Sequence, residues 1–396
     1  MHGPREAFKL HEASNLHEAP NLHEAPNPRE AASPREAASP REATKNCHGA
    51  RRHHNLRAIS VPIRQTVSRM IAPVQGIAQK AIAALELSRL PLAFGTVSGV
   101  WVMVFVARAE PALAELPAAR LPLWQTLPAA TMFAAGFLAF GAALNDFLDA
   151  KHDREFAPDR PIPSGLVQPR RAMQFAAVSL LVGIAGALPF GEGALLAALS
   201  LAAIVLLYDA CAKHVPAFGF VLVGLATAAS MLVPAPGTAL TLPIWLAMSQ
   251  TMGVGALAYV VGEKRPRLTR RAILLGAWGW LFWTAAILAL GVLRSDGELL
   301  PAWFAPNRLV VPFGVAAVGA LLLLRKLAGP RTAARGEQLL RAGSLWKSLV
   351  AAGWIYALGE PTAAFAIAGL ATVIFLVFAL LREAGPQVAE PATWRG

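Results

Sequence analysis

The sequence predicts an all-α integral membrane protein with nine transmembrane helices, on three observations. Apolar residues make up 55% of the 396 residues and charged residues only 15%, whereas a soluble domain carries about a quarter charged residues. Nine apolar stretches follow residue 87, and each is long enough, or nearly so, to cross a bilayer. Lys and Arg gather in the connections between these stretches, where they set the orientation of membrane helices.

The formal net charge of +12 does not predict a nucleic-acid partner. The basic residues are divided among short loops between apolar runs, so they indicate topology and contact with anionic membrane lipids. The only two cysteines, Cys47 and Cys211, are too few for a disulfide framework and have no zinc-ligand spacing.

Residues 1–60 are predicted to be a disordered tail of six-residue repeats. The repeat begins as Leu10-His11-Glu12-Ala13 and later reads Pro28-Arg29-Glu30-Ala31. Each unit has too little apolar surface to offset its ordering entropy, and proline interrupts helices. The recurring histidines (His11, His17 and His23) fall on different helix faces, which argues against a metal site. Alternatively, translation starts near Met70 and the assigned start of the sequence is wrong.

Three further segments complete the predicted domain organisation. Residues 61–86 form an amphipathic helix at the membrane interface, because Val67, Ile71 and Val74 recur at helical spacing opposite polar side chains. Residues 87–383 form the transmembrane domain, and residues 384–396 form a C-terminal tail.

The predicted spans follow one another closely. They cover residues 88–107, 122–144, 172–190, 192–208, 217–234, 241–262, 272–293, 308–325 and 361–381. The third and fourth are joined by the tight turn Phe190-Gly191-Glu192-Gly193, which makes them antiparallel. Ser348 to Leu358 is too short to span and lies beside Lys347 and Glu360, so an interfacial or re-entrant segment is expected there.

Loop charges then predict the topology. The connections after the even-numbered spans carry Lys151, Arg154, Arg160, Arg170, Arg171, Lys213, Lys264, Arg265, Arg267, Arg270, Arg271, Arg325, Lys326, Arg331, Arg335, Arg341 and Lys347. The opposite connections hold only Arg108, Arg120, Arg294 and Arg308. This asymmetry places the even loops and the N-terminus in the cytoplasm, and the C-terminus outside. The expected location is a bacterial inner membrane.

The second span ends in an acidic helical face. At about 100° per residue, Asp146, Asp149 and Asp153 fall within about 60° of one another, and Asn145 flanks them. Carboxylates grouped at a membrane boundary repel one another and oppose the helix macrodipole, so an ordinary acidic helix end explains them poorly. Oxygen ligands of this kind suit Mg²⁺, which binds through a few carboxylates together with substrate phosphates.

The residues of this face carry a family resemblance. Asn145-Asp146-x-x-Asp149-x-x-x-Asp153, followed by Arg160-Pro161-Ile162-Pro163-Ser164-Gly165, resembles the first aspartate-rich motif of the UbiA superfamily. Ser88-Arg89-Leu90-Pro91 and Tyr208-Asp209-x-x-x-Lys213 agree with it, and the segment Tyr208 to His214 resembles the EboC-like branch. The resemblance implies a nine-helix intramembrane prenyltransferase bundle.

The resemblance also implies residue roles. An allylic isoprenyl diphosphate ionises, and the carbocation alkylates an aromatic or lipophilic acceptor. By position, Asn145, Asp149 and Asp153 would bind Mg²⁺ with Asp146 in support. Lys213 and Arg160 would neutralise the leaving diphosphate, where charge develops in the transition state. Alternatively, Arg160 is a loop charge that sets the membrane topology, and Tyr208 is an aromatic anchor at the membrane interface.

The sequence departs from the family at the end of the sixth span. The family has two aspartates four residues apart there, whereas this chain places Glu263 at the first position and Arg267 at the second. Either Lys264, Arg265 and Arg267 hold the diphosphate directly and Glu263 keeps a catalytic role, or turnover has been lost. The rival function is therefore a non-catalytic isoprenoid- or pigment-handling protein. A transporter would place ionisable residues inside several spans, which are almost free of them.

Overall fold

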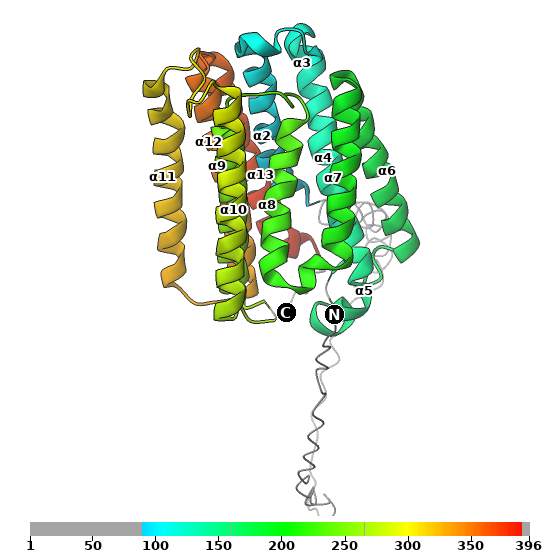
Figure 1. Cartoon of the computed structure of the whole chain (residues 1–396). Helices are drawn as coiled ribbons and strands as arrows, with labels where there is room; N and C mark the ends of the chain where they lie inside the picture. The colour runs from blue at the N-terminus through cyan, green and yellow to red at the C-terminus, as the bar shows by residue number, and fades with distance from the viewer. Residues whose placement is uncertain (1–88, 159, 265, 390–396) are drawn as a thin grey trace, which may run out of the picture. The chain divides into compact units, whose positions relative to one another are not determined.

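The computed structural model describes residues 89–158, 160–264 and 266–389, and its secondary structure in these ranges is helical throughout (Figure 1). The predicted repeat tail at 1–60 and the predicted interfacial helix at 61–86 lie outside the described residues. So do the last seven residues of the predicted C-terminal tail, 390–396.

Each predicted span corresponds to a helix. These are α2 (Leu90–Ala109), α4 (Leu123–Leu148), α6 (Pro169–Ala187), α7 (Glu192–Ala210), α8 (Pro216–Leu232), α9 (Leu242–Val261), α10 (Arg270–Arg294), α11 (Val310–Arg325) and α13 (Pro361–Ala389). Within the described part of the chain, eight helical segments are long and apolar enough to cross a membrane. The helix at Pro216–Leu232 is apolar but shorter. The helical membrane-protein class is confirmed, whereas the count of nine is not.

The prediction for Ser348 to Leu358 was wrong. All of these residues except Leu358, which follows it, belong to the 25-residue helix α12 (Ala333–Ala357), and this helix packs against α2, α9, α11 and α13. Trp354 and Ile355 are almost fully buried in this bundle. The first half of α12 carries Arg335, Glu337 and Arg341, so its hydropathy falls below that of an ordinary span although its length is sufficient.

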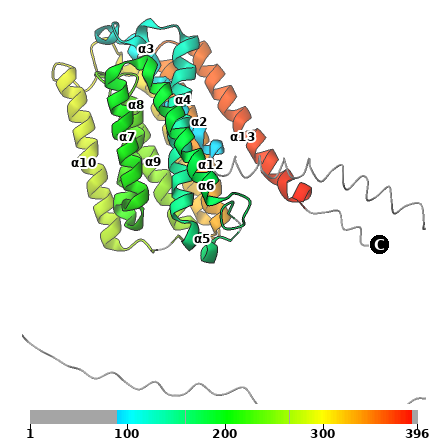
Figure 2. The same cartoon turned by 90° about the vertical axis from the view of Figure 1, so that its right-hand side faces the viewer.

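Helix α12 also changes where the chain ends. Gly336, near the start of α12, lies against Gly262 at the end of α9, and Gly353 lies against Pro312 at the start of α11. Helix α13 therefore begins at the end of the bundle away from α5 and runs back towards the α5 end (Figure 2). With nine spans the last one would run away from the end of the bundle where the first begins, whereas α13 runs back towards that end.

Local sequence explains where the helices begin. Proline occupies one of the first two positions of α2, α6, α8 and α9, where its missing N–H would have no helical partner anyway. Thr269 and Thr332 cap α10 and α12, because each side chain accepts a hydrogen bond from the backbone three residues later. The turn predicted between α6 and α7 is confirmed at Gly191, whose φ of 95° favours glycine.

The contact between α4 and α6 is built on glycine. A Cβ on Gly186 would lie 2.3 Å from the backbone nitrogen of Phe133, and one on Gly136 would lie 2.5 Å from that of Gly183. Small residues allow membrane helices to approach closely, and close packing replaces the hydrophobic driving force that lipid does not supply. These glycines consequently position α4, the helix that carries the acidic motif.

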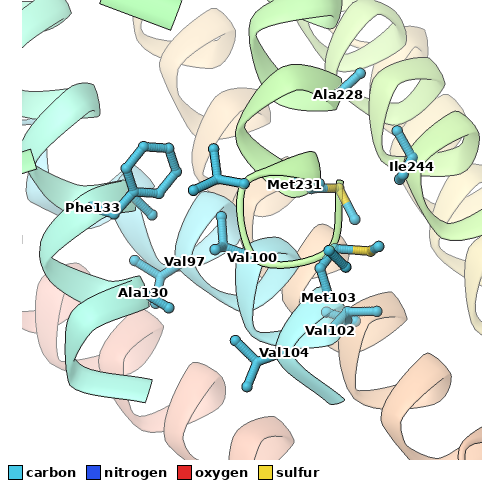
Figure 3. Close-up of a cluster of buried hydrophobic side chains, with 14 of the residues drawn as sticks. Val97, Val100, Val102, Met103, Val104, Ala130, Phe133, Ala228, Met231 and Ile244 are labelled. Carbon is cyan, nitrogen blue, oxygen red and sulfur yellow. The ribbon is translucent and has the colours of Figure 1, made fainter. Parts of the chain in front are cut away.

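Helix α2 lies at the centre of the bundle. Its residues Val100 and Val104 are fully buried, and they pack with Phe133 of α4, Met231 of α8 and Ile244 of α9 (Figure 3). Because α2 contacts α4, α8 and α12 along this core, Arg89, which directly precedes α2, is held close to the end of α4.

Candidate active site

The predicted acidic face lies at the α5 end of the bundle. Helix α4 ends at Leu148, Asp149 follows with φ −84° and ψ −1°, and the short helix α5 (Ala150–Phe156) continues from there. The backbone N–H of Asp153 still donates to the carbonyl of Asp149 at 2.8 Å, so the helical turn is almost continuous. The motif therefore keeps its carboxylates at one helix end, as the spacing predicted.

Lys213 joins two residues of the motif from another helix. Its ammonium lies 2.7 Å from a carboxylate oxygen of Asp149 and 3.2 Å from the side-chain oxygen of Asn145. Lys213 belongs to a 3-10 turn, Ala212–His214, that directly follows α7. The side chains of Lys213 and Asp149 are 11% and 26% exposed, so water screens this ion pair only weakly.

Arg160 joins the other part of the motif. Its guanidinium donates to Asp153 at 2.6 Å and lies 3.8 Å from Asp146. Burial lowers the pKa of Arg160, but the hydrogen bond and the charge of Asp153 outweigh burial, so the net pKa is raised and the group stays charged. A turn positions it, because the N–H of Ser164 donates to the Arg160 carbonyl at 2.9 Å and Gly165 adopts φ 79°.

Arg89 is a site residue that the motif analysis did not assign. Its guanidinium lies 3.6 Å from Asp146. The residue has φ 47°, an unusual backbone conformation outside glycine, at the start of α2. The signal in the sequence was the Ser88-Arg89-Leu90-Pro91 segment, which carried resemblance but no predicted role.

Asp209 is the second unassigned residue. It is 2% exposed, neither carboxylate oxygen has a hydrogen-bond partner among the described residues, and the charges of Lys213 and Arg89 act on it. Oδ1 of Asp146 is likewise buried without a hydrogen bond. A buried carboxylate oxygen without a hydrogen bond is costly, so this end of the bundle can bind a cation or a hydrogen-bond donor. The spacing Asp209-x-x-x-Lys213, one helical turn, could have revealed the pair.

The remaining predicted residues divide into two groups. Tyr208 lies close enough to Arg89 and Asp149 to interact with their charges. Lys264 is exposed overall, yet partial desolvation of its ammonium and the positive charges of Arg89 and Arg160 lower its pKa, so it lies within reach of the charges of the site. Glu263 and Arg267 are exposed, and their side chains form no ion pair with the described residues. Arg265 lies outside the described residues.

The donor set fits a hard divalent cation that is shared with phosphate. In the described part of the chain, no three His, Cys, Asp or Glu side chains lie close enough to hold a metal by themselves. Mg²⁺ does not need such a cage, because it keeps waters and usually takes one or two carboxylates together with substrate phosphates. Asp149 offers a carboxylate and Asn145 an amide oxygen, and the oxygens of Asp146 and Asp209 that lack a hydrogen bond lie nearby.

The amino-acid sequence matches a known protein family. Residues 100–349, from α2 into α12, match the UbiA prenyltransferase family. The chain belongs to this family. It is therefore a membrane transferase of the UbiA type, and the resemblance of the Asn145–Asp153 motif is confirmed at the level of the family. The match ends within α12, so α13 lies beyond it.

Relatives of this UbiA protein include archaeal enzymes named digeranylgeranylglyceryl phosphate synthase. The one from Methanopyrus kandleri is 31% identical over 228 residues, which cover 54% of this chain and 82% of the relative. The one from Methanococcoides burtonii is 28% identical over 226 residues, which cover 54% of this chain and 80% of that relative.

Two solved structures are also similar to the chain. A structure of digeranylgeranylglyceryl phosphate synthase has a TM-score of 0.49 and 19% identity over 70% of this chain and 98% of its own. A UbiA homologue from Archaeoglobus fulgidus, bound to GPP and Mg²⁺, has a TM-score of 0.45 and 15% identity. The match covers 70% of this chain and 99% of that structure's chain.

Proposed function

We propose that this UbiA-type prenyltransferase moves an isoprenyl group from an allylic diphosphate to an aromatic or lipophilic acceptor, with Mg²⁺ as cofactor. The observation that carries the proposal is the paired charge at the α5 end of the bundle. There Lys213 contacts Asn145 and Asp149, and Arg160 contacts Asp153. Cations and carboxylates are both present, so the site can bind a phosphate and a metal ion together.

Charge balance supports a metal ion in this reaction. Four carboxylates and four cations surround the site: Asp146, Asp149, Asp153 and Asp209, and Arg89, Arg160, Lys213 and Lys264. Their formal charges cancel, so an entering diphosphate needs further positive charge. Mg²⁺ bound by Asn145, Asp149 and Asp153, with Asp146 in support, would supply it and polarise the diphosphate.

The protein's own cations have a second role in the proposal. When the allylic C–O bond breaks, negative charge collects on the leaving diphosphate. Lys213 and Arg160 already point to this region, because they contact the carboxylates that would hold the metal. Fixed positive charge at a developing anion lowers the barrier to its formation. Lys264 contributes from the end of α9, and Tyr208 lines the same end of the bundle.

Two acceptor classes follow from the proposal. The relatives' name, digeranylgeranylglyceryl phosphate synthase, favours a prenylated glyceryl phosphate lipid. The sequence analysis also allows an aromatic ring. The competing function, supported by the Arg267 departure, is a non-catalytic isoprenoid- or pigment-handling membrane protein.

One assay separates enzyme from binder. Purified protein is incubated with Mg²⁺ and radiolabelled allylic diphosphates of several chain lengths, with and without prenylglyceryl phosphate or aromatic acceptors. Released diphosphate and prenylated product are then measured. Turnover that disappears with EDTA supports the enzyme, whereas saturable binding without release of diphosphate at any chain length supports the binder.

Replacing Arg267 by aspartate tests the departure at the end of α9. The substitution adds negative charge near Lys264 and restores the acid spacing of the family. The positive and negative charges of the site, however, already balance without it. We expect weaker allylic diphosphate binding and no gain in turnover. Arg271→Asp, at the exposed start of α10, is the matched control for the same change in charge. A gain of turnover in Arg267→Asp would show that the wild type has a disabled second metal site.

The topology is also a proposal. The α5 end carries the basic loops, so we propose that it faces the cytoplasm of a bacterial inner membrane. Single cysteines at residues 153, 267 and 384 are then expected to react with a membrane-impermeant thiol reagent from the same side, because α12 adds one crossing before α13. Residue 359 should react from the other side. Labelling of residue 359 from the same side as residues 153 and 267, with residue 384 on the other side, would remove α12 from the membrane.

A further inference from the structure

The ammonium of Lys213 contacts the same oxygens that the proposed metal ion would need. It lies 2.7 Å from Oδ1 of Asp149 and 3.2 Å from Oδ1 of Asn145. Both residues are proposed ligands of Mg²⁺. An ammonium and a divalent cation repel each other, and each is stabilised by the same carboxylate. Lys213 therefore competes with a divalent cation for Asp149.

Asp209 has a carboxylate that can receive this ammonium. It precedes Lys213 by four residues, at the end of α7, and the 3-10 turn that contains Lys213 follows. Asp209 is 2% exposed, and neither of its carboxylate oxygens has a hydrogen-bond partner among the described residues. Of the charged groups that act on it, Lys213 has the largest effect. The best-placed cation for Asp209 is thus already paired with another carboxylate.

The packing of α7 on α4 places the two carboxylates at successive levels. A Cβ on Gly141 would lie 4.0 Å from Oδ2 of Asp209, whereas Lys213 contacts Asn145, four residues later on α4. Positions four apart lie on the same helix face and are separated by about 6 Å along the axis. Asp209 therefore lies one turn further into the bundle than Asn145, and it faces the same side of α4.

The lysine side chain is suited to exchange between these levels. It carries a compact charge on a flexible four-carbon stem, and it has three N–H donors. One donor can turn to Asp209 while the others remain available for the oxygens of a diphosphate. Asp149 is its one ion-pair partner among the described residues, and the lysine side chain is only 11% exposed. Displaced without a new partner, the ammonium would be left buried and unpaired, which is costly.

We propose that Asp209 is a positioning residue that receives the ammonium of Lys213 when a divalent cation binds to Asp149. The inference rests on the proposed function, because that function assigns Asp149 to the metal ion. Before metal binding, Lys213 holds the charge of Asp149 in balance. After the exchange each carboxylate has its own cation, the metal ion for Asp149 and the lysine for Asp209.

A double-mutant cycle on metal affinity tests the exchange without turnover. The full chain in detergent is titrated with Mn²⁺, a paramagnetic substitute for Mg²⁺, and free Mn²⁺ is measured by EPR. Lys213→Met removes the competing ammonium, so we expect at least about tenfold tighter binding, and Asp209→Asn should weaken binding by about tenfold. In the Lys213→Met background the loss caused by Asp209→Asn should be at least about fivefold smaller, because no ammonium then needs Asp209.

The cycle distinguishes a partner of Lys213 from a ligand of the metal ion. Equal losses for Asp209→Asn in both backgrounds overturn the proposal, since a direct ligand or a distant charge acts whether or not Lys213 is present. Unchanged or weaker Mn²⁺ binding by Lys213→Met also overturns it. Without metal, Asp209→Asn should not lower Tm, because it removes a buried charge that has no hydrogen bond. A lower Tm with equal losses would make Asp209 structural.

Controls separate the exchange from folding and from the proposed function. Lys326→Met and Glu298→Gln change exposed residues outside the site and should bind Mn²⁺ like the wild type. The predicted coupling without any release of diphosphate would overturn the proposed enzyme function and leave the exchange standing. Release of diphosphate without the coupling would do the reverse. Absence of saturable Mn²⁺ binding in the wild type and in Lys213→Met would overturn both.

Discussion

Replacing Asp149 by alanine is expected to abolish diphosphate release. Asp149 is at once the carboxylate partner of Lys213 and, by proposal, a ligand of Mg²⁺. Its removal takes away metal binding and leaves the Lys213 ammonium with Asn145 alone. Removing one preorganised hydrogen-bond donor from a transition-state site costs about 10²–10³-fold, and we expect at least that loss here. Single-turnover release of radiolabelled diphosphate measures it.

Two further variants make the result specific. Asp149→Asn keeps the shape and a hydrogen-bond acceptor for Lys213 while removing the charge, so it should fold normally and still lose release. Glu155→Ala removes an exposed carboxylate from α5 and should keep full activity. If Asp149→Ala changes only the affinity for allylic diphosphates, and wild type shows no release, the chain is a binding protein.

Replacing Gly186 by leucine is expected to prevent stable folding. A Cβ at this position would meet backbone atoms of α4, with Phe133 nitrogen at 2.3 Å and Ala129 oxygen at 2.6 Å. Backbone cannot rotate away as a side chain can, so α4 and α6 must separate. Overpacking costs about 1–3 kcal/mol even where side chains can adjust, and more is expected here. Size-exclusion profiles and Tm in detergent measure the loss.

Gly193→Leu is the matched control, because a Cβ at Gly193 meets nothing within 4 Å. It lies in the first turn of α7, and the substituted protein should fold and remain active. A folded Gly186→Leu protein with normal Tm would show that α4 and α6 do not need this close approach. A folded variant that has lost activity would instead show that the glycine serves mainly to position Asp146 and Asp149.

Of the ten long helices in the described part of the chain, hydropathy located nine, because lipid imposes a simple rule on each of them. A helix that faces lipid must be apolar along its length, and this can be read without knowledge of its neighbours. Hydropathy did not identify α12, because this helix packs against α2, α9, α11 and α13 and need not be apolar along its whole length. Protein rather than lipid packs against this helix, and the Lys347 ammonium contacts the Thr251 hydroxyl at 3.4 Å. The missed helix and the unexpected lysine inside the bundle therefore have one cause.

The sequence alone determined the membrane class, the position of the acidic motif and its likeness to UbiA enzymes. Each rests on composition or on spacing within one helix. Only the tertiary structure decided which cation faces which carboxylate. Lys213 with Asp149 and Arg89 with Asp146 join residues more than fifty positions apart. It also brought Lys347 of α12 to Gln250 of α9. Helical periodicity describes one helix at a time, whereas these contacts depend on how small residues let separate helices approach.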